Sequence, residues 1–293
     1  MSILKISNLS KTYENGVKAL DDVSLEIPVG MFGLLGPNGA GKSTLMRTIA
    51  TLQSADAGSI TLGGIDVLSQ HMEVRRVLGY LPQEFGLYPR VSAVELLNHI
   101  AILKGVTDTK ERKDTIDALL QRTNLYEHRK RKLGGYSGGM KRRFGIAQAL
   151  LANPKLIIVD EPTAGLDPIE RNRFHNLLCE LGENTVVILS THIVEDVKEL
   201  CTNMAIINKG KVLVQEDPMV SIRNLEGKVY RKTIAKSELA TYKLSHQVIA
   251  QRLVQGRQVI HVLAAGSPGE GFDQVSPDLS DVYFSNILSD ESN

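Results

Sequence analysis

The sequence has little of what marks a secreted or membrane-spanning chain. Two cysteines occur among its 293 residues, Cys179 and Cys201, and they stand in no metal-ligand or CxxC spacing. Two lone thiols are typical of a reducing cytosol, and we interpret them as small buried hydrophobic residues. The first residues are polar and charged, so no signal peptide is expected. The longest apolar runs are far shorter than the ~18 residues needed to cross a bilayer, so no membrane-spanning segment is expected either.

The sequence also lacks an excess of either charge. Its formal net charge is +1, with 23% charged and 42% hydrophobic residues. These totals give no indication of a nucleic-acid partner or of an anionic membrane surface, and no nucleic acid is expected. We interpret the short basic clusters at 128–132 and 141–143 as solvated helix faces. The apolar share is ordinary for a globular protein, and the length predicts one large domain or one with a small companion.

The order of apolar and alternating segments predicts an α/β fold. Continuous apolar runs at 31–35, 156–159 and 186–189 are typical of buried strands in a parallel sheet, and 77–81 reads as another strand. Helical patterns follow these runs, at about 42–52, 168–181 and 193–200. Alternating segments near the N-terminus predict a separate antiparallel β subdomain, with strands at 4–9, 23–27 and 58–67.

A helical subdomain is predicted between two parts of the core sheet, at about 84–153. Ser92 and Glu95 form a capping box in front of an apolar helical pattern. Further helices are expected at 108–122 and from Ser137 onward.

The composition changes at Asp217-Pro218. Beyond it we expect strands at 229–234, 247–253 and 259–263, with a helical piece near Ser237. The predicted organisation is therefore a main domain over 1–217 and a small α+β accessory domain over 218–293, which is near the lower size limit for independent folding.

A phosphate-binding loop joins the apolar strand 31–35 to the helix after it. The segment matches G-x-x-x-x-G-K-[ST] at every fixed position, and the strand before it and the helix after it make a chance glycine-rich turn the weaker alternative. Its backbone N–H groups and the helix N-terminus favour an anion. Lys42 is predicted to neutralise the β- and γ-phosphates of ATP, and the Ser43 hydroxyl to bind Mg²⁺. The predicted ATP-binding residues here are Gly36, Pro37, Asn38, Gly39, Ala40, Gly41, Lys42, Ser43 and Thr44.

Two carboxylates at the end of the strand 156–159 complete the predicted site. A phosphate-binding loop alone does not choose among kinase, GTPase, helicase and transporter motor. Strand ends at the carboxyl edge of a parallel sheet face the ligand, so Asp160 and Glu161 are expected beside the phosphates. Asp160 would hold Mg²⁺ through water, and Glu161 would orient and deprotonate the attacking water. The alternative, two surface carboxylates, is weak once the phosphate-binding loop is present.

The segment Tyr136-Ser137-Gly138-Gly139-Met140 resembles the signature motif of ABC-transporter ATPases. The phosphate-binding loop, this segment and the Asp160-Glu161 pair stand in that family's order, and the resemblance covers residues 4 to about 217. It implies two copies packed head to tail, with each ATP held between the loop of one copy and the signature of the other. Ser137 suits a helix N-cap, and the two glycines allow a close approach to the γ-phosphate.

The departures from the motif concern the subclass. Met140 stands where many members have Gln, and Tyr136 where many have Leu. This form resembles the single-domain ATPases that serve drug, antibiotic or polymer exporters.

Four further positions match the family's functional residues. The resemblance implies that Tyr13 stacks on adenine, a type of contact worth ~1–3 kcal/mol; alternatively it is a tyrosine in an edge strand. Gln83 matches the glutamine that contacts Mg²⁺ and the attacking water, unless Pro-Gln merely ends a strand. Asp167 matches the loop that crosses the dimer interface, or else caps the helix opened by Pro168. His192 matches the histidine that contacts the γ-phosphate, although a lone histidine is usually structural.

The resemblance therefore implies a Mg²⁺-dependent ATPase that drives export through separate integral membrane permease subunits. It would act with a second copy of itself or a similar ATPase, as a peripheral protein on the cytoplasmic face of the cell membrane. A soluble family member acting on ribosomes or DNA is the first rival, disfavoured by the single phosphate-binding loop and the absence of heptads. A regulatory module that holds nucleotide without turnover is the second, and Glu161 argues against it.

The segment 84–89 joins the predicted sheet to the helical subdomain. Its Gly and Pro content predicts a loop, yet it offers Phe85, Leu87 and Tyr88. These side chains either dock on a membrane subunit, as the family resemblance implies, or fill the seam between the two subdomains.

Overall fold

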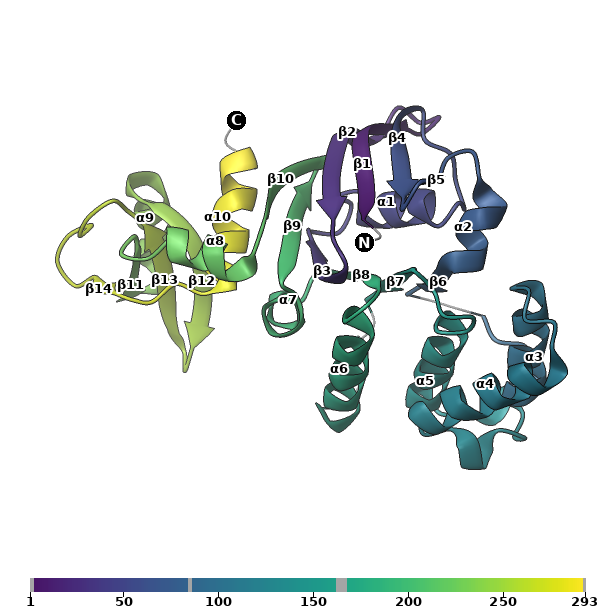
Figure 1. Ribbon diagram of the computed structural model, residues 1–293. Helices are drawn as coiled ribbons and strands as arrows, with labels where there is room; N and C mark the ends of the chain where they lie inside the picture. Colours follow the sequence, from purple (N-terminus) through teal and green to yellow (C-terminus); the bar gives the residue numbers. More distant parts are fainter. Residues whose placement is uncertain (1–2, 84–85, 162–167, 292–293) are drawn as a thin grey trace.

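The computed structural model describes residues 3–83, 86–161 and 168–291. It has a central α/β body, a helical block on one side and a smaller C-terminal part on the other (Figure 1). The predicted fold class is confirmed, including the parallel core sheet and the inserted helices. No helix in the described ranges combines the length and apolarity that a bilayer crossing requires.

The core sheet has six strands in the order β10-β9-β3-β8-β7-β6. The strands β6, β7, β8, β3 and β9 pair in parallel, and β10 is antiparallel at one edge. The strands β9 and β10 were not predicted, although the apolar run in β9 is as long as those in β7 and β8. The bounds are β3 (Gly30–Leu35), β6 (Leu78–Leu81), β7 (Leu156–Asp160), β8 (Val186–Thr191), β9 (Asn203–Asn208) and β10 (Lys211–Glu216).

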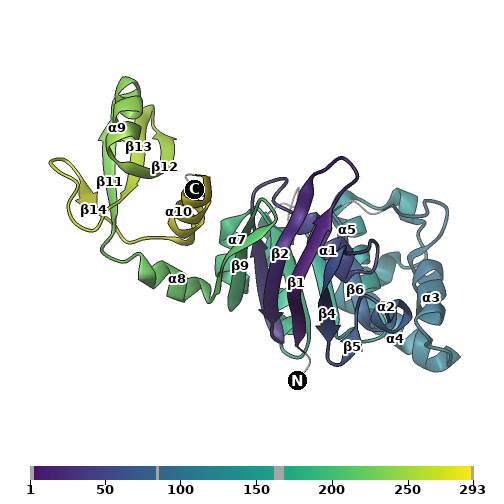
Figure 2. The same cartoon turned by 90° about the horizontal axis from the view of Figure 1, so that it is seen from above.

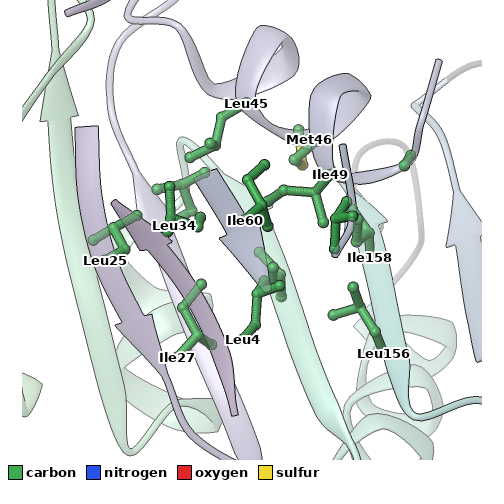
Figure 3. Packing of buried hydrophobic residues seen from close by; sticks show 14 of the residues in the cluster. Leu4, Leu25, Ile27, Leu34, Leu45, Met46, Ile49, Ile60, Leu156 and Ile158 are labelled. Carbon is green, nitrogen blue, oxygen red and sulfur yellow. The ribbon is translucent and has the colours of Figure 1, made fainter. Parts of the chain in front are cut away.

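An antiparallel sheet in the order β2-β1-β4-β5 faces the core sheet. The helix α1 lies between the two sheets, and apolar side chains from all three layers meet there, among them Leu4, Leu45 and Leu156 (Figure 3). Removal of this apolar area from water holds the layers together. The bounds are β1 (Leu4–Thr12), β2 (Lys18–Ile27), α1 (Lys42–Ile49), β4 (Ala57–Leu62), β5 (Ile65–Asp66) and the unpredicted α2 (His71–Val77).

The helical block consists of α3 (Ala93–Leu103), α4 (Thr109–Arg122) and α5 (Gly138–Ala149). The capping box is confirmed, because Ser92 Oγ accepts from Glu95 N at 3.3 Å and Glu95 Oε2 accepts from Ser92 N at 2.8 Å. Ser137 caps α5 by accepting from Met140 N at 3.2 Å. The block has its own core around fully buried Phe144, so it is a distinct packing unit.

Two helices cover the face of the core sheet opposite α1. These are α6 (Pro168–Gly182) and α7 (Val194–Leu200), which contact β3 and β8. Figure 1 shows α6 running down beside the helical block and α7 lying below β9.

The C-terminal part has a four-stranded antiparallel sheet, β12-β13-β11-β14, with a small core around Ile260. The last helix, α10, returns from this sheet to the main body (Figure 2), where Leu279 and Val282 join the apolar cluster of the core sheet. His261 Nδ1 lies 2.7 Å from Asp281 Oδ1, which ties β13 to α10. The bounds are α8 (Pro218–Asn224), β11 (Val229–Ile234), α9 (Leu239–Ser245), β12 (Gln247–Val254), β13 (Arg257–Leu263), β14 (Asp273–Gln274) and α10 (Leu279–Glu291).

Candidate nucleotide-binding site

The phosphate-binding loop connects β3 to α1 and borders a pocket of about 690 Å³. Two of its glycines, Gly36 and Gly41, are required by the packing around them. Gly41 has φ +106, and a Cβ there would lie 2.4 Å from the carbonyl oxygen of Ala19. A Cβ on Gly36 would lie 2.3 Å from the carbonyl oxygen of Ile207. Any side chain at either position would displace backbone, so the loop keeps its curvature through glycine.

Lys42 is the first residue of α1 and is almost completely buried. Its Nζ donates to the carbonyl oxygens of Gly36 at 2.6 Å and Pro37 at 3.0 Å. Burial lowers the pKa of Lys42, and the charges of Glu161 and Asp160 oppose that shift. The ammonium group is therefore held inside the loop by the two carbonyls, at the position where a phosphate oxygen would meet it.

Asp160 is the last residue of β7 and is buried at the carboxyl edge of the sheet. Burial raises the pKa of Asp160, the neighbouring charge of Glu161 adds to the rise, and Lys42 lowers it. Arg142 also lowers the pKa of Asp160. The positive charges of Lys42 and Arg142 thus oppose the effect of burial without cancelling it.

Glu161 has a left-handed backbone, with φ +46, which residues other than glycine seldom adopt. Its N–H donates to the carbonyl oxygen of Ser190 at 2.8 Å. Its Oε2 accepts from Gln83 Nε2 at 3.0 Å, and its Oε1 lies 2.9 Å from His192 Nδ1. The ends of three neighbouring strands, β6, β7 and β8, thus bring together the three polar residues that the sequence analysis singled out separately.

Arg142, on α5, is a site residue that the sequence analysis missed. Its Nη1 donates to the carbonyl oxygen of Gln83 at 3.1 Å, and its Nη2 donates to the carbonyl oxygen of Glu161. Burial lowers the pKa of Arg142. The interpretation of 141–143 as a solvated face is therefore wrong for this residue. A basic triplet contains no signal for which of its members turns inward.

Tyr13 lies at the mouth of the same pocket, with its hydroxyl 3.0 Å from Thr44 Oγ1 and its ring partly exposed. Among the described residues that line the pocket, none comes from the segment Ser137-Gly138-Gly139. Gly138 has open space on its side-chain face. Asp167 lies outside the described residues. The chain therefore gathers the phosphate-binding loop, Tyr13, Gln83, the acid pair and His192 in one place, and carries the signature residues elsewhere.

Known proteins resemble this chain over most of its length. The ABC transporter family model matches residues 20–164. The probable multidrug ABC transporter ATP-binding protein YbhF of Escherichia coli is 32% identical over 96% of this chain and 51% of its own length. The linearmycin resistance ATP-binding protein LnrL of Bacillus subtilis is 38% identical over 72% of this chain and 68% of its own length.

A solved structure of the ATP-binding cassette MJ0796, a dimer in a post-hydrolysis state bound to ADP and Pi, superposes with a TM-score of 0.67. It is 29% identical and is covered over 98% of its length by 73% of this chain. The chain belongs to the family of ABC transporter ATP-binding proteins. It spans about half the length of the E. coli relative.

Proposed function

We propose that this chain hydrolyses ATP and, as a dimer, powers export through separate membrane subunits. The observation that carries the proposal is the carboxylate of Glu161, held by Gln83 and His192 at the border of the phosphate-binding pocket. A hydrolase needs an acceptor for the proton of the attacking water, in line with the γ-phosphate. A chain that merely stored nucleotide would not need this arrangement.

Each residue of the site has a separate role in the proposed hydrolysis of ATP. The loop N–H groups and Lys42 bind the phosphates of ATP, and Lys42 Nζ exchanges its two carbonyl partners for phosphate oxygens. Glu161 accepts the proton of the water that attacks the γ-phosphorus, while the bond from that phosphorus to the bridging oxygen breaks. His192 and Gln83 fix the direction of the carboxylate. The products are ADP and inorganic phosphate.

Mg²⁺ fits the residues at this site. Ser43, Gln83 and Asp160 line the same pocket and offer a hydroxyl, an amide oxygen and a carboxylate, the ligand types that Mg²⁺ prefers. The described residues contain no group of three or more His, Cys, Asp or Glu that could hold a metal alone. The phosphates and water would therefore complete the coordination. When bound, the ion neutralises charge on the phosphates.

A second copy of this chain, or a similar subunit, supplies the missing signature residues. Ser137 caps α5 away from the chain's own phosphate-binding pocket. Gly138 has open space on its side-chain face, whereas the carboxylate of Glu170 lies against Gly139, so an anionic ligand at this helix N-terminus would displace Glu170. Head-to-tail pairing, which the family resemblance implies, would place this end against the γ-phosphate bound by the partner. The solved relative MJ0796 is a dimer. Asp167 is proposed to act at the same interface. ATP closes the dimer, and hydrolysis reopens it.

The membrane partner is proposed to dock beside the helical block, at the cytoplasmic face of the membrane. Within the described part of the linking segment, Leu87 packs against the core of the helical block, whereas the side chain of Tyr88 is 67% exposed. Phe85 lies outside the described residues. Leu87 is thus part of the packing of the helical block itself, and Tyr88 is the candidate for docking. The multidrug and linearmycin-resistance relatives favour export as the direction.

The test is phosphate release by the purified chain with Mg²⁺ and ATP, compared with Lys42→Ala. We expect turnover that requires Mg²⁺ and that falls by about 100-fold or more in the variant, as for the loss of an electrostatic contact to the transition state. Equal rates for the two proteins would overturn the assignment. ATP-dependent dimer formation of the wild-type chain, followed by light scattering, tests the second half of the proposal.

A further inference from the structure

Arg142 joins the signature helix to the catalytic edge of the same chain. Its guanidinium reaches two backbone carbonyls, Gln83 at the end of β6 and Glu161 at the end of β7. Ser137 stands five residues earlier, at the N-cap of the same helix α5. The helix α5 therefore carries both Ser137, which the proposed dimer places at the partner's nucleotide, and Arg142, which contacts the backbone of this chain's own Glu161.

The backbone of Glu161 is held from both sides. Its N–H donates to Ser190 on β8, and its carbonyl oxygen accepts from Arg142 on α5. The left-handed φ of +46 is unfavourable for glutamate and persists because the surroundings impose it. A change in the position of Arg142 changes one of the two restraints, and with it the direction of the carboxylate.

The far end of α5 is fixed against the sheet. A Cβ on Gly79 of β6 would lie 2.2 Å from the carbonyl oxygen of Ala149, the last residue of the helix, so backbone packs directly on backbone there. At 1.5 Å of rise per residue, Arg142 stands about 10 Å and Ser137 about 18 Å from this fixed end. A tilt that moves Ser137 by about 2 Å moves Arg142 by about 1 Å. A shift of this size changes the geometry of the 3.1 Å hydrogen bond from Arg142 Nη1 to the carbonyl oxygen of Gln83.

We propose that Arg142 is a positioning residue that couples the two ATP sites of the dimer. The inference rests on the proposed function. ATP on the partner's phosphate-binding loop fixes Ser137, Ser137 fixes the tilt of α5, and Arg142 then sets Glu161 for hydrolysis of this chain's own ATP. Each site is thereby made sensitive to the occupancy of the other.

The residue type fits this role. The planar guanidinium carries several donors in a rigid fork, so one side chain spans two carbonyls that belong to different strands. A lysine keeps the charge but carries its donors on one nitrogen at the end of a flexible stem, so Arg142→Lys removes the planar two-nitrogen contact with little change in charge. The exposed neighbour Lys141 provides a matched control, Lys141→Ala, on the same helix and outside the site.

The first test measures the initial rate of ATP hydrolysis against ATP concentration for the wild type, Arg142→Lys and Lys141→Ala. We expect a Hill coefficient above about 1.5 for the wild type and Lys141→Ala, within the limit of two set by two sites. For Arg142→Lys we expect a coefficient near 1 and a kcat at least tenfold lower. Binding of a fluorescent ADP to each protein is expected to stay within about threefold, because Arg142 does not line the phosphate-binding pocket.

The second test places the substitution in one subunit of a doubly tagged dimer. One subunit carries Glu161→Gln, so hydrolysis occurs only in the other. Arg142→Lys is placed either in the hydrolysing subunit or in the subunit that carries Glu161→Gln. We expect the first placement to slow turnover at least tenfold more than the second. Equal slowing in both placements, or an unchanged Hill coefficient in the homodimer, would overturn the coupling role and leave Arg142 as a structural contact.

Other results bear on the proposed function instead. A wild-type chain without Mg²⁺-dependent turnover, or without an ATP-dependent dimer, contradicts the proposed function itself. If the dimer with one hydrolysing subunit shows no turnover, the Hill coefficients of the homodimers alone test the coupling role. A coefficient for Arg142→Lys equal to that of the wild type then overturns it. Arg142→Gln repeats the comparison if Arg142→Lys does not fold, as judged by its circular dichroism.

Discussion

The contact between Gly79 and Ala149 predicts a specific effect of one added methyl group. In Gly79→Ala the new Cβ would lie 2.2 Å from the carbonyl oxygen of Ala149 and 3.0 Å from its carbonyl carbon. Real carbon–oxygen contacts are about 1 Å longer, and both atoms belong to backbone, so no side chain can rotate away. The end of α5 must move by about that amount. Overpacking of this kind costs about 1–3 kcal/mol.

The assay is thermal unfolding of the purified chain, with urea unfolding as a second measure. For a chain of this size, each kcal/mol corresponds to about 2–4 °C, so the melting temperature should fall by about 2–12 °C. Gly266→Ala is the matched control, since nothing lies within 4 Å of a Cβ there and its φ is not left-handed. Equal melting temperatures for Gly79→Ala and Gly266→Ala would refute the reasoning about direct backbone packing.

Two further predictions concern assembly. Lys42→Ala and Ser137→Arg homodimers should both be nearly inactive, and mixing them should restore modest activity through dimers with one intact composite site; full activity of the Ser137→Arg homodimer would contradict binding in trans. Tyr88→Ala should keep its stability within ~0.5 kcal/mol and lose co-purification with the membrane subunit, whereas Leu87→Ala should lose stability through its contact with the helical core. A Tyr88→Ala variant that retains full binding to the membrane subunit would exclude this docking position.

The sequence predicted the local elements well where one physical signal dominated. Continuous apolar runs gave β3, β7 and β8, and the capping box gave the start of α3. The strand β10 was missed because it lies at the edge of the core sheet and is half-exposed. The strand β9 is buried and has an apolar run at 204–207 as long as those of β7 and β8, so the sequence contained the signal for it. The helix α10 was not predicted, although Leu279, Val282 and Tyr283 stand at helical spacing and pack on the main body. The helix also contacts β12 of the C-terminal part, so apolar residues lie on more than one of its faces.

The site was predicted residue by residue from motifs, and the structure adds how its parts are held. Gln83, Glu161 and His192 meet because their strands are neighbours in the sheet. No pattern in the sequence indicates that Arg142 contacts Glu161, because that contact depends on how the helical block sits against the sheet. The domain boundary near residue 217 stays a prediction, and α10 returns across it to pack on the main body.

The central claim is that Glu161 accepts the proton of the attacking water, and Glu161→Gln tests it most directly. The substitution keeps the size of the side chain and removes the proton acceptor. We predict that turnover falls by ~10²–10⁴-fold while ATP binding is kept, so that the variant accumulates as an ATP-bound dimer. Single-turnover phosphate release, measured together with the dimer fraction, gives both quantities from one sample. Near-normal turnover by the variant would contradict the account.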